Sequence, residues 1–219
     1  MPKTRPPRGR LSPTASARWS LSPRTRRRST RHCGGRSTRR CTGSRPTAPI
    51  WWLRSPPWWS FPWGAPHTTG TLPSGLPVGI PYVEDGLGWT DAVAIGVGGA
   101  GVTYEVRNAD DWAELCRRYP FEVTASRGHD WYRVTGRAGR WLLPDWGRVA
   151  QEWDAVHLTA WAYLTAATRE IRVDDEYASV IGGWAPDETY WLTGRVRETG
   201  ERRVRWSARD PEGPWRRAD

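Results

Sequence analysis

The sequence has 219 residues, a formal net charge of +10 and a pI of about 10.3. That balance favours a nucleic-acid or anionic-membrane partner. The charge is unevenly placed, however. Residues 1–83 hold 15 basic and no acidic residues, whereas residues 84–219 hold 18 basic and 23 acidic ones, a net charge of −5. The basic pI therefore describes the first part of the chain and carries no information about the second.

The cysteines exclude a protein stabilised by a disulfide framework. Cys33, Cys41 and Cys116 cannot all pair, and the separation of the first two matches no common zinc spacing. No apolar run is long enough to cross a bilayer, and no signal-peptide core follows the basic N-terminus. These features predict a cytoplasmic protein without a membrane span.

Residues 1–75 have the composition of a disordered head. Arg, Ser, Thr, Pro, Gly and Trp dominate, and aliphatic residues are too few for burial to offset the entropy of ordering the chain. Two origins are open: a genuine basic tail, or a wrong start site or reading frame, since an alternative frame of a GC-rich gene yields this composition. Five tryptophans lie within Ile50–Trp63. Arg and Trp together can bind single-stranded nucleic acid by charge and stacking, or lie at a membrane interface.

Residues 84–219 begin with a strand and a run of glycines. Thr90–Val97 predicts a strand, and Gly96–Gly101 matches the dinucleotide-binding pattern G-x-G-x-x-G. That pattern needs a helix directly after the glycines, because the helix N-terminus holds the pyrophosphate. Val102–Val106 has a β-like composition instead. We therefore expect a turn between two strands here and no dinucleotide site.

Two amphipathic helices are predicted. Asn108–Tyr119 begins with a capping residue, has apolar residues at i, i+3, i+4 and i+7, and stops at Pro120. Its apolar stripe includes Cys116, which we therefore expect in the core and not at a reactive site. Pro144–Trp153 repeats the same spacing, and Phe121–Val134, between the two helices, is predicted to be extended.

Short β-like runs fill the rest of the domain: Ala155–Ala160, Ile171–Val173, Tyr177–Ile181 and Thr189–Thr193. From Arg195 onward the chain is charged and is expected to fray, although Val204 and Trp206 could form one more edge strand. The sequence thus predicts an α+β fold. It would be one small mixed domain of short strands and two short amphipathic helices over residues 84–219, preceded by the disordered basic head.

Two motifs stand out in this domain. One is Trp153-Asp154-Ala155-Val156-His157-Leu158-Thr159, followed by Tyr163-Leu164-Thr165, and the other is Gly183-Trp184-Ala185-Pro186-Asp187-Glu188-Thr189-Tyr190-Trp191-Leu192. In these motifs the chain resembles an uncharacterised family of actinobacterial proteins. The resemblance covers roughly residues 105–193 and leaves out the head. It implies a genuine domain from a GC-rich genome, and it implies no particular activity.

His157 is the strongest candidate for chemistry, because histidine suits acid–base work near neutral pH. The alternative is an ordinary hydrogen-bonded histidine on a half-exposed strand. A fold-level analogy with ADP-ribosyltransferases adds Arg133, Thr159 and Glu188, in the Arg–Ser/Thr–Glu order of such enzymes, or His157, Tyr163 and Glu188 in a His–Tyr–Glu version. Glu188 would then bind a ribose hydroxyl of NAD, the cofactor that this analogy alone implies. The histidines and acids follow no metal-ligand spacing.

Three functions stay open on the sequence. The first is a binding or interaction module with a protein partner, which requires an exposed aromatic or apolar patch. The second is an NAD-using enzyme that resembles ADP-ribosyltransferases. The third is a nucleic-acid binder that acts through the basic head.

Overall fold

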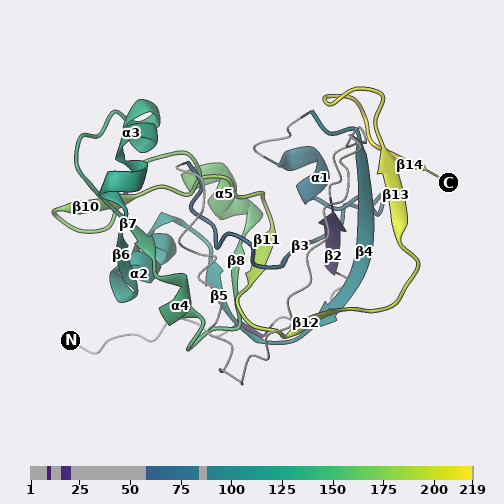
Figure 1. Cartoon of the computed structure of the whole chain (residues 1–219), viewed down its shortest axis with the longest axis horizontal. Coiled ribbons are helices and arrows are strands. Elements are labelled where there is room, and N and C mark those ends of the chain that lie inside the picture. The colour runs from purple at the N-terminus through teal and green to yellow at the C-terminus, as the bar shows by residue number, and fades with distance from the viewer. Residues whose placement is uncertain (1–8, 11–15, 21–57, 84–87, 219) are drawn as a thin grey trace, which may run out of the picture.

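The computed structural model describes residues 9–10, 16–20, 58–83 and 88–218. The α+β class predicted from the sequence is confirmed: these residues form five helices and two sheets (Figure 1). None of the five helices is long and apolar enough to cross a membrane.

The larger sheet is mixed and contains ten of the described strands. Their order is β1-β5-β8-β11-β3-β2-β4-β13-β14, and β12 also pairs with β4. Among the described strands of this larger sheet, only β5 and β8 pair in parallel. The bounds are β1 Gly9–Arg10, β2 Ser16–Ser20, β3 His67–Thr69, β4 Asp91–Gly99, β5 Val102–Val106, β8 Ala155–Leu158, β11 Glu188–Trp191, β12 Val196–Glu198, β13 Val204–Ser207 and β14 Arg216–Ala218.

The larger sheet is strongly curled at the glycine run. Only Ala100 and Gly101 join β4 to β5, yet four strands separate the two in the sheet. This connection spans about 11 Å at most, whereas strands five places apart in a flat sheet lie roughly 24 Å apart. The glycines allow the close approach, since a Cβ on Gly99 would lie 3.3 Å from the Trp191 ring of β11. The run is thus a corner between two strands, and the expectation that no helix follows it is confirmed.

The smaller sheet lies at the opposite side of the molecule from β13 and β14 (Figure 1). Its order is β6-β7-β10-β9, with bounds β6 Pro120–Glu122, β7 Arg140–Pro144, β9 Ile171–Arg172 and β10 Tyr177–Ser179. Helices α2 (Ala109–Arg118) and α3 (Thr124–Thr135) both pack on β7, and α2 also contacts β5, so it joins the two sheets. The remaining helices are short: α1 Gly79–Tyr82, α4 Trp146–Val149 and α5 Ala160–Ala166.

The first predicted helix is confirmed in detail. Asn108 caps α2, because its side chain accepts a hydrogen bond from the Asp111 amide at 2.9 Å. The apolar stripe, including Cys116, is fully or almost fully buried, and burial raises the pKa of the Cys116 thiol to about 12. The second predicted helix is shorter than expected: α4 has four residues, with Asp145 as its cap. Its stripe residues Trp146, Val149 and Trp153 are nevertheless buried.

Between these helices the prediction of an extended segment over Phe121–Val134 is wrong. A three-residue strand, β6, is followed by α3, which has 12 residues. The aromatic and β-branched composition favours a strand locally, but tertiary packing decides otherwise. Arg127 and Trp131, at i and i+4, are buried on one face of α3. Trp131 packs edge-on against Trp141 of β7, with ring centroids 5.3 Å apart.

The structure places the start of the folded region before residue 75. Residues 58–75, assigned to the head by composition, pack into the domain through β3 and through Ser60, which is fully buried. The Ser60 amide donates to the Gly182 carbonyl at 2.9 Å, and the Ser60 hydroxyl accepts from the Gly182 amide at 2.9 Å and from Trp184 Nε1 at 3.1 Å. Strands β1 and β2 also come from the predicted head. The rest of residues 1–57 lies outside the described residues, so its predicted disorder stays a prediction.

The C-terminal residues expected to fray also form part of the larger sheet. β12 and β13 both pair with β4, and β14 pairs with β13. Trp206 of β13 is buried beside Ala92 and Ala94 in a small second core that includes Leu76 and Ile80. The prediction that Val204 and Trp206 lie in a strand is confirmed, but β14 takes the edge position. The charged side chains of this segment lie on its exposed face.

Ser60→Ala tests whether residues 58–63 belong to the folded domain. The substitution leaves the buried Gly182 amide and the Trp184 indole without their acceptor. It should therefore lower the free energy of unfolding by about 2–4 kcal/mol, measured by urea denaturation. Ser74→Ala, at an exposed serine, is the control and should change it by less than about 0.5 kcal/mol. Equal effects of the two substitutions would mean that the hydrogen bonds of Ser60 with Gly182 and Trp184 do not stabilise the domain.

Candidate functional site

Strand β11 lies at the centre of the candidate site, because its two faces carry different polar groups. In its pairing with β8, Glu188 lies opposite Leu158 and Thr189 lies opposite His157. Directly opposed residues share a face and successive residues alternate. Glu188 therefore points to the main core with Leu158, whereas His157 and Thr189 share the other face.

On the core side, Glu188 pairs with a histidine from β3. His67 Nδ1 lies 2.5 Å from Glu188 Oε1, and the Ala185 amide donates to Glu188 Oε2 at 2.7 Å. Glu188 is only 3% exposed, while the His67 side chain is 27% exposed. Both oxygens of this buried carboxylate thus have partners, as burial of a charge requires. The pair presents the imidazole, and not the carboxylate, toward the surface.

His67 is also the end of a column of five aromatic rings, which we call the aromatic column. Its members, in stacking order, are Trp63, Trp59, Phe61, Tyr190 and His67. Successive ring centroids are 4.9, 5.1, 5.1 and 5.3 Å apart, and successive planes differ by 23°, 26°, 11° and 17°. These values are typical of offset stacking. The column folds back at Trp59, since Trp63 also lies 6.0 Å from Phe61.

Exposure increases from Tyr190 toward the tryptophan end of the column. Tyr190 is 4% exposed, and burial raises the pKa of its hydroxyl well above the ordinary value, with the nearby Glu188 adding to the effect. Phe61 and Trp59 are half-buried, and Trp63 is 37% exposed. The column is therefore buried at Tyr190 and partly exposed at both ends, at the His67 imidazole and at the Trp63 indole.

Glycines of the loop before β11 make room for the column. Gly183 has φ +76°, and a Cβ on it would lie 2.5 Å from Trp59 Cδ1 and 2.9 Å from Phe61 Cε1. A Cβ on Gly182 would lie 2.8 Å from the Trp58 carbonyl oxygen, which accepts a hydrogen bond from Trp131 Nε1 at 2.9 Å. The close approach of Gly182 and Gly183 thus positions residues 58–61 directly against the loop before β11.

On the other face of β11, His157 contacts Thr189 and an acidic side chain. His157 Nδ1 lies 2.9 Å from Thr189 Oγ1, and Nε2 lies 3.6 Å from Asp187 Oδ1. Burial lowers the pKa of His157, although Asp187 and Glu105 act in the opposite direction. Burial therefore favours the neutral imidazole on this face. Asp187 has a left-handed backbone, with φ 60°, a conformation that costs free energy in a residue other than glycine.

The sequence-predicted candidates do not meet in one place. His157 and Glu188 lie on opposite faces of the β8–β11 pair. Thr159 caps α5, accepting from the Ala162 amide at 3.1 Å and donating to the Val106 carbonyl at 3.2 Å. Arg133 is exposed on α3, a helix that packs on the smaller sheet. The arrangement that the ADP-ribosyltransferase analogy needs is therefore not assembled by these four residues.

Sequence reasoning singled out the tryptophans of Ile50–Trp63 but assigned them to the disordered head, and it missed His67, because composition was averaged over the whole head. A finer division would have found them. The last basic residue of the head is Arg54, and residues 58–83 contain no Lys, Arg, Asp or Glu. A neutral stretch with Leu72, Leu76 and Ile80 has the composition of a folded segment. The pairing of His67 with Glu188 spans 121 positions, and local patterns cannot predict it.

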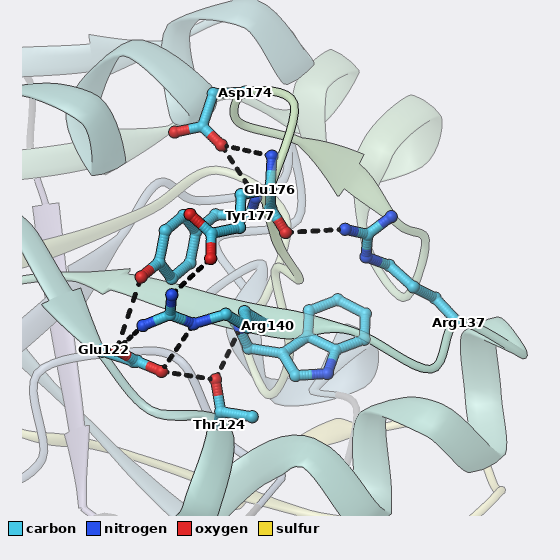
Figure 2. Close-up of polar contacts among 8 residues, drawn as sticks. Glu122, Thr124, Arg137, Arg140, Asp174, Glu176 and Tyr177 are labelled. Carbon is cyan, nitrogen blue, oxygen red and sulfur yellow. Dashed lines mark hydrogen bonds and ion pairs between the residues drawn. The ribbon is translucent and has the colours of Figure 1, made fainter.

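Polar groups also gather on the smaller sheet (Figure 2). Arg140 donates from Nε and Nη2 to the two oxygens of Glu122, at 3.1 and 2.6 Å, and also pairs with Glu176. Its guanidinium lies 4.5 Å from the centre of the Tyr177 ring. Asp174 accepts from the amides of Glu176 and Tyr177 at 2.9 and 2.7 Å, as expected of a turn. Arg140 thus pairs with two carboxylates, and the network links the strands of the smaller sheet.

Two further observations complete the description of the site. Within the described ranges, no group of three or more His, Cys, Asp and Glu side chains is arranged to hold a metal ion. Two large apolar side chains on α5, Trp161 and Leu164, are each 68% exposed.

No protein-family model, curated protein or solved structure matches the chain. The resemblance to the actinobacterial family therefore stays a prediction. The candidate site has to be judged on its geometry alone.

Gly183→Ala tests the packing of the aromatic column. The new Cβ would meet Trp59 and Phe61, and the residue would keep an unfavourable left-handed backbone. We expect the free energy of unfolding to fall by about 3 kcal/mol, measured by urea denaturation. Gly136→Ala is the matched control, because Gly136 has φ +75° and its Cβ would meet nothing within 4 Å. It should cost about 1–2 kcal/mol, and an equal cost at both positions would argue against tight packing at Gly183.

His157→Asn tests the burial of the neutral imidazole. The folded chain holds the pKa of His157 below the ordinary value near 6.5, so below that pH the unfolded chain binds more protons. Stability should then fall as the pH drops from 6.5, by at most about 1.4 kcal/mol per pH unit from this group. Urea denaturation at pH 7.5 and 5.5 should show a smaller loss in His157→Asn. His129→Asn, at an exposed histidine of α3, should retain the wild-type loss; an unchanged loss in His157→Asn contradicts the assignment.

Proposed function

We propose that this protein is a cytoplasmic binding module whose ligand-facing surface is the aromatic column. The observation that carries the proposal is the column itself, which is held in place from the core outward and ends in a partly exposed indole. A surface of this kind binds a flat partner by stacking. An interaction module was expected to have an exposed aromatic patch, and the exposed part of Trp63 supports the same interpretation.

Preorganisation is the physical argument for binding. Phe61 stacks on the buried ring of Tyr190, and Gly183 allows Trp59 and Phe61 to approach the loop before β11. A ligand that stacks on Trp63 would therefore meet rings whose rotamers are already restricted. Binding then avoids much of the entropy cost of ordering side chains, about 0.5–1.5 kcal/mol for each one.

The polar groups near the column favour binding over catalysis. The carboxylate of Glu188 is engaged by His67 and by the Ala185 amide, and the His157 imidazole lies on the opposite face of β11. A general acid–base pair would need both groups within reach of one substrate. The NAD-using alternative requires Glu188 to bind a ribose hydroxyl, and its present partners compete with that role.

Trp63→Ala in the full chain tests the proposal. Two probes offer flat faces of different chemistry: a 15-nucleotide oligothymidylate and the neutral oligosaccharide cellohexaose. At least one should shift the indole N–H resonances of Trp59 and Trp63 in ¹⁵N–¹H NMR spectra, assigned with single Trp→Phe variants. Trp63→Ala should weaken that binding at least about fivefold, whereas Trp161→Ala, which removes an exposed indole on α5, should not. If neither probe at millimolar concentration shifts these resonances, the column is not a binding surface.

A further inference from the structure

We propose that a pocket on the hairpin of β13 and β14 binds a small phosphorylated polyol, such as a sugar phosphate, with its phosphate held by Arg209 and Arg216. This site goes beyond the proposed function, because it lies at the edge of the larger sheet and not at the aromatic column (Figure 1). The pocket has a volume of about 620 Å³, within the range of roughly 300–1,000 Å³ that is typical of small-molecule sites. Its lining residues are Ser207, Ala208, Arg209, Asp210, Pro214 and Arg216.

The pairing of β13 with β14 brings two polar side chains of the pocket together. Ser207, the last residue of β13, lies directly opposite Arg216, the first residue of β14. Directly opposed residues share a face of a sheet, and successive residues alternate. Because Trp206 is buried in the second core, Ser207 and Arg216 point away from that core. Both lie at the end of the hairpin where the connecting loop begins.

The loop that joins the two strands, residues 208–215, is held by a turn and by packing. The Gly213 amide donates to the Asp210 carbonyl at 3.0 Å. The sequence Asp210-Pro211-Glu212-Gly213 is typical of such a turn, because aspartate, proline and glycine are favoured at its first, second and fourth positions. Trp215 packs against the second core. The pocket is therefore largely shaped before a ligand arrives, which lowers the entropy cost of binding.

The two arginines of the pocket have charge to offer a ligand. Among the residues that the structure describes, neither Arg209 nor Arg216 takes part in an ion pair, whereas Arg140 of the smaller sheet pairs with two carboxylates. Residues 204–218 hold four basic and two acidic residues, within a domain of net charge −5. The hairpin is thus a local basic region on an acidic domain, and it attracts anions to this edge.

A phosphate monoester matches these groups better than a carboxylate does. A guanidinium can form two parallel hydrogen bonds to oxygen acceptors, so two arginines together can occupy all of the roughly four acceptor positions of a carboxylate. The Ser207 hydroxyl would then lack an acceptor. A phosphate has three terminal oxygens and a charge of about −1.5 to −2 at pH 7. It can therefore accept hydrogen bonds from Arg209, Arg216 and Ser207 together.

Asp210 favours a ligand that carries hydroxyl groups beside its phosphate. A Cβ on Gly213 would lie 3.0 Å from both oxygens of the Asp210 carboxylate, so this side chain lies over the turn. A carboxylate accepts hydrogen bonds from hydroxyls but repels a nearby phosphate. It therefore directs the phosphate toward the arginines and can bind the rest of the ligand. The volume of the pocket leaves room for that part.

The experiment titrates the full chain with D-ribose 5-phosphate at physiological salt concentration and follows the backbone amides by ¹⁵N–¹H NMR. Amides within residues 207–216 should shift. Arg209→Gln and Arg216→Gln should each weaken binding about 10- to 150-fold, while Arg209→Lys should retain part of the affinity, because it keeps the charge and loses the planar fork. Arg217→Gln is the matched control, since Arg217 is exposed on the same hairpin, opposite Trp206, and does not line the pocket. It should weaken binding less than about threefold.

Three further ligands identify the chemistry that the pocket recognises. Inorganic phosphate should bind more weakly than D-ribose 5-phosphate, and D-ribose without phosphate should not bind. Asp210→Asn should bind inorganic phosphate more tightly than wild type does, because a like charge is removed. Succinate should bind more weakly than either phosphate, and the reverse order would identify a carboxylate ligand and reject the proposal.

Other results would also overturn the inference. One is the absence of shifts within residues 207–216 at millimolar D-ribose 5-phosphate, and another is equal binding of D-ribose. A loss in Arg217→Gln as large as that in Arg216→Gln would mean that the net charge of the hairpin, and not the pocket, attracts the ligand. Trp63→Ala should keep the wild-type Kd, so a failure here leaves the proposed function standing. Circular dichroism and the urea midpoint of each variant establish that it is folded.

Discussion

The contact between Ser60 and the loop Gly182–Trp184 determines the structure of the candidate site. A buried loop must satisfy its backbone groups, and here one serine provides acceptors and donors for two of them and for an indole. The glycines at 182 and 183 have no Cβ, so the segment from Trp58 to Phe61 can lie directly on the loop. Once this segment is fixed, Phe61 meets Tyr190 and the chain continues into β3 beside β11. The aromatic column and the His67–Glu188 pair both follow from that placement.

The alternation of side chains along β11 separates two sets of polar groups that sequence reasoning had combined. Glu188 and Thr189 are neighbours in the chain, yet one contacts His67 in the margin of the main core and the other contacts His157 on the opposite face. Adjacent residues of a strand cannot serve one cleft on one face. This geometric rule, more than any missing residue type, argues against a catalytic set built from His157 and Glu188.

The sequence predicted those elements whose causes are local. Helix α2 has a capping asparagine, a complete apolar stripe and a proline stop, and each signal agrees with the others. Helix α3 was missed because its buried face is set by Trp141 and Trp58, which lie elsewhere in the chain. The strands at the C-terminus were expected to fray because their charged residues face solvent, while β4 supplies the pairing that orders them. Of the candidate site, Glu188 was identified, but its partner His67 was not, since their contact joins two residues that lie 121 positions apart in the chain.

The division of charge acquires a structural meaning once the start of the folded region is known. Residues 58–83 belong to the folded region and are uncharged, and the last cation before them is Arg54. A neutral aromatic surface therefore separates a stretch of 15 positive charges from a domain of net charge −5.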